Sequence, residues 1–159
     1  MGMLMKWKRV LLRIVLFACL GLLIEVFFTA GYALIRGNWN MHGNSSPWML
    51  IVYGLLGVLI RPVSEQFRRW RIPYLGRAFF YMVCIFAVEY MYGVVFNMAG
   101  LRIWDYSNYA WNLHGHITLV YTPFWFFLAL WLEYLHKKLD ACAVVMAAGY
   151  SADDILADR

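Results

Sequence analysis

The sequence predicts an all-α integral membrane protein built as a bundle of four transmembrane helices. Of its 159 residues 64% are hydrophobic, whereas a soluble domain has about 45–50% apolar residues. Long apolar stretches alternate with short polar segments, and basic residues flank them, as membrane topology requires. Tryptophans fall near the ends of the stretches, where interfacial aromatic residues are enriched. These observations together predict a polytopic membrane protein.

The apolar stretches define a four-span membrane domain over residues 1–140 and a short cytoplasmic tail over residues 141–159. A spanning helix needs about 20 residues, which the first, third and fourth stretches supply. The second is short if it ends before Arg61. It either continues to residue 67, with the Arg61 side chain extending to the interface, or crosses only half the membrane; we expect a full crossing. The predicted spans are residues 12–35, 47–67, 74–99 and 115–135.

The basic residues predict that both termini lie in the cytoplasm. They cluster before the first span, between the second and third, and after the fourth, whereas the other side carries only Arg36 and Arg102. Cytoplasmic loops carry the excess of lysine and arginine, so the crowded side is the inner one. This placement explains the net charge of +5 without a nucleic-acid partner. The inner residues are Lys6, Lys8, Arg9, Arg13, Arg61, Arg68, Arg69, Arg71, Arg77, Lys137 and Lys138.

A lone carboxylate lies near the middle of the first and third spans. Glu25 is the only charged residue of the stretch 14–35, and Glu89 is the only one of 78–101. A charge at the bilayer centre costs about 2.5–3.5 kcal/mol on insertion scales, so such residues usually have a function. The glutamates are predicted to bind a proton or cation, or to act as an acid/base pair. The alternative is that each is a hydrogen-bonded packing element between helices.

The same features recur in the same order in the two halves of the membrane domain. Each half has an intramembrane glutamate, then an outer arginine and tryptophan, a His-Gly pair and a Val-Tyr pair, at similar but unequal spacings. One interpretation is a parallel repeat of two helices, in which both glutamates face a shared central seam; chance similarity is the other. The corresponding residues are Glu25 and Glu89, Arg36 and Arg102, Trp39 and Trp104, His42 and His114, and Tyr53 and Tyr121.

The segment 102–116 is dense in polar and aromatic residues on the predicted outer side. Asp105 is the only acid on that side, and Arg102 is close enough in sequence to pair with it. The segment is either the lip or lid of a central cavity, or an interfacial loop whose polar residues form turns and caps. The candidate ligand-binding residues are Glu25, Glu89, Arg102, Trp104, Asp105, Tyr106, Asn112 and His114.

No metal or cofactor is expected. His114 and His116 form an isolated His-x-His pair, and a metal site would need a further histidine or a carboxylate within reach. The three cysteines have neither a disulfide pattern nor the spacing of a haem or iron–sulfur motif. The sequence contains no glycine-rich phosphate loop and no Walker motif, so we expect no nucleotide hydrolysis by this chain alone.

Other local features predict packing and not chemistry. Glu133 has Lys137 four residues later, which predicts an ion pair on a helix surface. Ser151 precedes acidic residues, so the tail is either a short helix capped by Ser151 or disordered. Small residues in the spans predict close helix approach. These residues are Gly21, Gly31, Gly54, Gly57 and Gly93.

Several motifs resemble those of a known family. The Trp-Asp-Tyr-Ser block at 104–107 and the following run 112–119 resemble a block shared by the transmembrane protein 229 family and a bacterial group named "putative ABC-transporter type IV". The Glu-Val-x-Phe-Thr-Ala motif at 25–30 resembles the same family, and the likeness covers about residues 18–135. The chain departs from the family at His114 and His116, where the family has no fixed histidine. The resemblance implies a multi-pass protein of the cell membrane, most simply the bacterial inner membrane, and says little about activity.

The sequence predicts a protein that binds or translocates a small solute, ion or lipid, as a subunit of a transporter. Two alternatives stay open. One is a membrane-embedded lipid-modifying enzyme that uses Glu25, Glu89 and Asp105, and the other is a scaffold without chemistry. The expected partners are the lipid bilayer, such a ligand, and either a second copy of the chain or a larger membrane complex.

Overall fold

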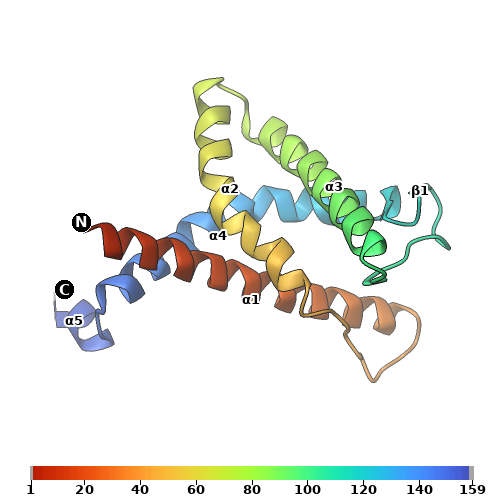
Figure 1. Ribbon diagram of the computed structural model, residues 1–159, viewed down its shortest axis with the longest axis horizontal. Helices are drawn as coiled ribbons and strands as arrows, with labels where there is room; N and C mark the ends of the chain where they lie inside the picture. Colours follow the sequence, from red (N-terminus) through yellow and green to blue (C-terminus); the bar gives the residue numbers. More distant parts are fainter. Residues whose placement is uncertain (1, 158–159) are drawn as a thin grey trace. The chain divides into compact units, whose positions relative to one another are not determined.

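The computed structural model describes residues 2–157 and is dominated by helices (Figure 1). Among these residues, three helices are long and apolar enough to cross a membrane, which confirms the predicted class of all-α membrane protein. They are α1 (Met3–Ile35), α2 (Met49–Arg69) and α3 (Tyr74–Met98). The helix α4 (Thr122–Ala148) has 27 residues and is not among them, because four charged residues lie near its middle: Glu133, Lys137, Lys138 and Asp140.

The second predicted span forms one continuous helix through Arg61 and Pro62. Helix α2 has 21 residues, and at about 1.5 Å per residue it is about 31 Å long. The hydrocarbon core of a bilayer is about 30 Å thick. The helix is therefore long enough for a complete crossing, and the full crossing itself stays a prediction.

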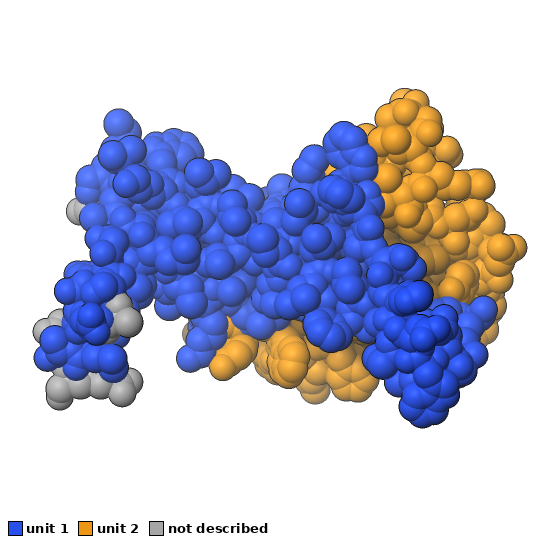
Figure 2. All heavy atoms as spheres, turned by 90° about the horizontal axis from the view of Figure 1, so that it is seen from below, with its two compact units in different colours: residues 1–61, 135–159 blue, residues 62–134 orange. Residues whose placement is uncertain are grey.

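The chain divides into two compact units (Figure 2). The first contains residues 1–61 and 135–159, and the second contains residues 62–134. The boundaries fall inside α2 and α4. The first unit holds Glu25 with the connection from α1 to α2, and the second holds Glu89 with the connection from α3 to α4.

In the first unit, glycines bring α1 and the first half of α2 into backbone contact. A Cβ atom at Gly57 would lie 3.0 Å from the carbonyl oxygen of Arg13, and one at Gly54 would lie 3.1 Å from the Ile14 side chain. Such close approach is typical of membrane helices with small residues at their interface. The prediction of close contact is wrong for Gly31, which has no neighbouring atom within 4 Å of a built Cβ.

In the second unit, the chain between α3 and α4 folds back on itself as a short hairpin. Strand β1 (Asn112–Leu113) pairs antiparallel with β2 (Ile117–Thr118), in a register that places Asn112 opposite Thr118. The 3-10 turn η1 (Leu119–Tyr121) then leads into α4, and the Thr118 side chain accepts a hydrogen bond from the Val120 N–H to cap it. The hairpin lies against α3.

All four long helices end with the same hydrogen-bond pattern. The residue after the C-cap adopts a left-handed conformation, its N–H bonds back to the third residue before it, and the next N–H bonds five residues back. This is the Schellman motif, in which glycine is the usual left-handed residue because it has no Cβ. The left-handed residues are Gly37 after α1, Arg71 after α2, Gly100 after α3 and Gly149 after α4.

Residues 141–148 of the predicted tail continue α4, and a short helix, α5 (Ala152–Ala157), follows. Ser151 Oγ accepts a hydrogen bond from the Asp154 N–H, and the Asp154 carboxylate accepts from the Ser151 N–H. This reciprocal arrangement is a capping box. Of the two predicted alternatives for the tail, the helix capped by Ser151 is confirmed.

Replacing Gly57 with leucine is expected to destabilise the first unit by about 1–3 kcal/mol, the usual cost of overpacking. The added side chain meets the α1 backbone at Arg13, which cannot rotate away. Thermal unfolding of the purified protein in detergent measures the effect. Gly31→Ala is the matched control, because the open space there leaves only the gain in helix propensity. Equal unfolding temperatures for both variants would contradict the packing at Gly57.

Candidate functional site

Glu25 is held by two hydroxyl groups of the first unit. Its Oε2 accepts hydrogen bonds from Tyr53 Oη at 2.9 Å and from Ser45 Oγ at 2.7 Å. Gly21 lies one turn earlier on the same face of α1, and a Cβ there would lie 2.3 Å from Cγ of Tyr53. The missing side chain at Gly21 therefore makes room for the Tyr53 ring, whose hydroxyl then reaches the carboxylate.

The connection between α1 and α2 is tied to α1 directly after Glu25. The Asn44 N–H donates to Thr29 Oγ1 at 2.8 Å. Gly43 lies so close to α1 that a Cβ there would be 2.2 Å from the carbonyl oxygen of Val26. These contacts hold the loop against the helix, and they place Ser45 beside Glu25.

Glu89 accepts a hydrogen bond from a tyrosine of the second unit. Tyr106 Oη donates to Glu89 Oε1 at 3.0 Å. The Tyr106 ring makes edge contacts with the rings of Tyr109 and Tyr121, at centroid distances of 5.7 and 5.4 Å. Three tyrosines from the segment before α4 therefore pack together and position the hydroxyl that reaches α3. Each predicted intramembrane glutamate thus has a tyrosine hydroxyl as donor.

The turn at Asp105 fixes the start of the segment 102–116. Asp105 Oδ1 accepts from the Ser107 N–H at 2.9 Å and from Ser107 Oγ at 2.6 Å, and Arg102 approaches the other oxygen at 3.4 Å. The hydrogen bonds from Ser107 and the nearby positive charge of Arg102 lower the pKa of Asp105 from its ordinary value. The Tyr106 N–H donates to the carbonyl of Gly115, which closes the segment into a loop.

A small polar cavity of about 50 Å³ lies between the end of α3 and this loop. Gly93 of α3 lies against His116, since a Cβ at Gly93 would be 2.9 Å from the imidazole. A ligand pocket for a drug-sized molecule is about 300–1,000 Å³, so this cavity fits a water molecule or a single ion. Its polar lining includes Asn97, Arg102, Trp104, Asp105, Ser107, His114 and His116.

The structure brings some of the predicted site residues together and separates others. Arg102, Trp104, Asp105 and His114 line the cavity, whereas neither Glu25 nor Glu89 does, so the role of the segment as the lip of a central cavity stays a prediction. Tyr106 joins Glu89 by its hydroxyl. Asn112 has a different role from these residues, because its side chain bonds backbone groups of the hairpin loop. Glu25 belongs to the other unit.

The histidines of the segment take part in protein contacts. His114 Nδ1 is hydrogen-bonded to the Tyr90 hydroxyl at 2.9 Å, and the carbonyl of His116 accepts from the Trp104 indole at 2.8 Å. Within residues 2–157 no group of three or more His, Cys, Asp or Glu side chains is placed to hold a metal ion. The two histidines therefore help to hold the loop in place around the cavity.

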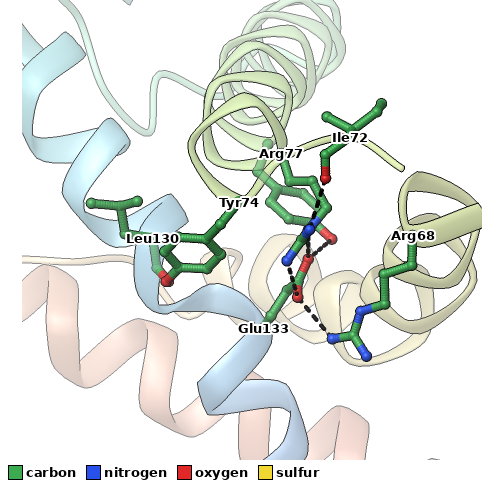
Figure 3. A network of polar contacts seen from close by, with 7 residues as sticks. Arg68, Ile72, Tyr74, Arg77, Leu130 and Glu133 are labelled. Carbon is green, nitrogen blue, oxygen red and sulfur yellow. Dashed lines mark hydrogen bonds and ion pairs between the residues drawn. The ribbon is translucent and has the colours of Figure 1, made fainter. Parts of the chain in front are cut away.

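A buried acid whose partners the sequence pattern did not reveal lies at the basic end of the second unit. Glu133 is only 8% exposed. It accepts hydrogen bonds from Arg77 Nε at 2.7 Å, from an Arg68 nitrogen at 2.8 Å and from Tyr81 Oη at 3.1 Å (Figure 3). The prediction of a surface pair with Lys137 is therefore wrong, because the carboxylate points away from solvent toward α2 and α3. The sequence feature that could have indicated these partners was the cluster of arginines around the connection between the second and third predicted spans.

The first unit contains a comparable long-range interaction that the sequence pattern did not predict, between Asp140 and two arginines. Asp140 of α4 accepts hydrogen bonds from Arg9 Nε and from an Arg13 nitrogen, each at 2.9 Å. Arg13 is 6% exposed. A buried charge is tolerated only with a partner and hydrogen bonds, and Asp140 supplies both to α1. The arginines that indicated topology in the sequence thus also join α1 to α4.

The helices, their apolar surfaces and the internally paired charges define a helical integral membrane protein. The chain matches the family described as "Putative ABC-transporter type IV" over residues 12–152, and it belongs to that family. The family match includes the segment 102–116 and both Glu25 and Glu89. No solved structure matches the chain.

Replacing Glu133 with glutamine is expected to cost about 3 kcal/mol of stability. Breaking one side of a buried ion pair leaves the other charge uncompensated, and here that charge is Arg77, with a side chain 16% exposed. Thermal unfolding in detergent measures the loss. The exposed Glu65 of α2, replaced by glutamine, is the matched control and is expected to change little. A loss no larger than that of the control would contradict a structural role for Glu133.

The loop at Asp105 is expected to loosen in acid. A carboxylate whose pKa is lowered by folding stabilises the fold fully above its unfolded pKa, and the contribution disappears as the pH falls through the folded pKa. The ordinary value is 3.8, so order around Trp104 is expected to decline below about pH 4 and to persist at neutral pH.

Fluorine NMR of fluorotryptophan-labelled protein follows this transition, with the Trp104 resonance assigned by Trp104→Phe. In Asp105→Ala the resonance is expected to have its acid position already at neutral pH. The Trp39 resonance, from outside the loop, is the internal control. A Trp104 resonance that is unchanged by Asp105→Ala at every pH would contradict this role of the carboxylate.

Proposed function

We propose that the chain is a membrane subunit of a transporter, in which Glu25 and Glu89 bind a proton or a small cation within the membrane. The observation that carries the proposal is a lone carboxylate in each of two apolar helices, each with a tyrosine hydroxyl as hydrogen-bond donor. Carboxylates at such depth are typical of proton relays and ion pathways in transporters.

The hydrogen bonds of each glutamate support a site at which an ion can replace the hydroxyl donor. Carboxylate oxygens are ligands for protons and for hard cations. Glu25 accepts hydrogen bonds from the hydroxyls of Ser45 and Tyr53, and Glu89 accepts one from the hydroxyl of Tyr106. Glu133 and Asp140 are instead held by guanidinium groups. A hydroxyl can yield its place to a cation without leaving a buried positive charge behind. The two central acids are therefore the ones suited to reversible binding.

The cavity beside Asp105 favours an ion over a larger substrate. Its volume of about 50 Å³ is well below that of pockets for small organic molecules, about 300 Å³ or more. A lipid-modifying enzyme using Glu25, Glu89 and Asp105 would need room for a lipid headgroup, so this alternative has less support. Asp105, with its lowered pKa, offers a fixed negative charge to a cation entering the cavity.

The family description points to a transporter of the ABC type, in which nucleotide hydrolysis drives transport. The sequence of this chain contains no Walker motif, so an ATPase subunit would be a separate partner. The arrangement that we propose is a complex in which this chain supplies membrane helices and the partner supplies nucleotide hydrolysis.

Proton movement in liposomes tests the proposal. The purified chain is reconstituted into liposomes that contain a fluorescent pH dye, and the decay of an imposed pH gradient is compared with that of empty liposomes. Wild-type protein is expected to accelerate the decay. Glu25→Gln and Glu89→Gln are each expected to reduce the acceleration at least ten-fold, because the amide cannot take up a proton. Asp153→Asn removes an exposed acid of α5 and is the matched control.

Infrared spectroscopy separates proton binding from transport. A pH titration of the wild type is expected to show the carboxyl bands of Glu25 and Glu89. Each band is expected to disappear in the corresponding glutamine variant. The bands are expected to shift in Tyr53→Phe and Tyr106→Phe, which remove the hydroxyl donors. If the glutamine variants keep all carboxyl bands and also conduct protons at the wild-type rate, the proposed site is wrong. Thermal unfolding of each variant verifies that the fold is intact.

A further inference from the structure

In the turn between α2 and α3, Arg71 adopts a backbone conformation that is unfavourable for any residue with a Cβ atom. Arg71 has φ +56°, the left-handed region in which a Cβ atom is strained. Its N–H donates to the carbonyl of Arg68, and the Ile72 N–H donates to the carbonyl of Phe67, so Arg71 is the left-handed residue of the Schellman motif. The other long helices place a glycine at this position.

An arginine here makes the turn less stable than glycine would, so folding alone gives no reason for it. A strained conformation at a residue with a functional side chain is typical of binding sites. The side chain of Arg71 is exposed. Among residues 2–157, neither it nor the neighbouring exposed Arg69 forms an ion pair or a side-chain hydrogen bond.

The arginines of this turn divide into two pairs. Arg68 and Arg77 point toward Glu133, and their charges compensate that carboxylate (Figure 3). Arg69 and Arg71 are left with their charges free in the solvent-exposed part of the turn. The turn therefore presents two positive charges that no acid of the described chain neutralises.

The surroundings of these charges are those of a membrane interface. Trp70 lies between the two arginines and is 63% exposed, while Tyr74 and Leu75 at the start of α3 are 48% and 64% exposed. Tryptophan and tyrosine are enriched at the level of lipid headgroups. The turn joins two helices that are each long and apolar enough to cross a membrane, so it lies where headgroups are found.

We propose that Arg69 and Arg71 bind the phosphate of an anionic phospholipid, while Trp70 and Leu75 contact its glycerol and upper acyl region. Basic clusters directly beside membrane helices attract anionic lipids, with a contribution that corresponds to about five-fold in affinity for each arginine or lysine. The exposed apolar side chains favour a lipid over a soluble phosphate compound, which has no acyl chain to cover them. The place of the turn at the ends of two candidate membrane helices favours a lipid over an acidic protein.

Native mass spectrometry of the full chain in detergent tests the proposal. The protein is titrated with phosphatidylglycerol and with phosphatidylcholine, and the ratio of the two association constants is measured. Wild-type protein is expected to prefer phosphatidylglycerol. Arg69→Gln and Arg71→Gly are each expected to reduce this preference about five-fold, and the double variant more than ten-fold. Arg71→Gly restores the usual residue of the turn, so its unfolding temperature is expected to equal or exceed that of the wild type.

Arg36→Gln is the matched control, since it removes an exposed arginine from the end of α1 and is expected to leave the preference unchanged. The proposal is overturned if Arg36→Gln lowers the preference as much as the turn variants, because the effect would then be diffuse charge. Competition by glycerol phosphate at the same concentration as the lipid would show a soluble-anion site instead. Full lipid preference in the double variant, with loss of a co-purifying protein, would show a protein-docking site instead.

Discussion

The need to compensate each carboxylate in or beside an apolar helix shapes this protein. A charge without a partner is costly in hydrocarbon and in a protein interior, and Glu25, Glu89, Glu133 and Asp140 each have specific donors. Glu25 and Glu89 near the middle of apolar helices are bound by hydroxyls. Glu133 and Asp140 in α4 are bound by arginines of other helices. The donors that bind these acids thus differ in type: hydroxyl groups bind Glu25 and Glu89, and guanidinium groups bind Glu133 and Asp140.

Small residues decide whether those donors can reach the acids. Gly21 admits the Tyr53 ring beside Glu25, and Gly93 admits the loop that carries Tyr106 to Glu89. Each glycine lies four residues from its glutamate, hence on the same face of its helix. The two halves of the chain therefore solve one problem in the same way: a glycine and a glutamate on one helix face receive an aromatic donor from the following segment. The repeat itself stays a prediction, because the donor to Glu89 is Tyr106 and not Tyr121, the residue that corresponds to Tyr53 in the sequence.

The positions of the charged residues in the sequence predicted the locations of the helices, but they did not predict which residues of different helices contact one another. The lone glutamates and the basic flanks identified the apolar spans, because hydrocarbon excludes charge wherever the chain crosses it. Glu133 shows the limit of this reasoning. Its spacing from Lys137 suggested a local pair, but its partners are 56 and 65 residues away. Local spacing could not reveal them, because a long-range pair depends on which face of α4 turns toward α2 and α3.

The sequence alone determined the class of protein, the long apolar helices and the two acids within them, since these follow from composition and period along a single helix. It also marked the segment 102–116 as unusual. Only the tertiary structure decided which hydroxyl meets which glutamate, that the segment closes around a small cavity, and that Arg68 and Arg77 face Glu133 while Arg69 and Arg71 remain exposed. These choices depend on close approach at single glycines and on one left-handed arginine, which are properties of the packed chain and not of any local pattern.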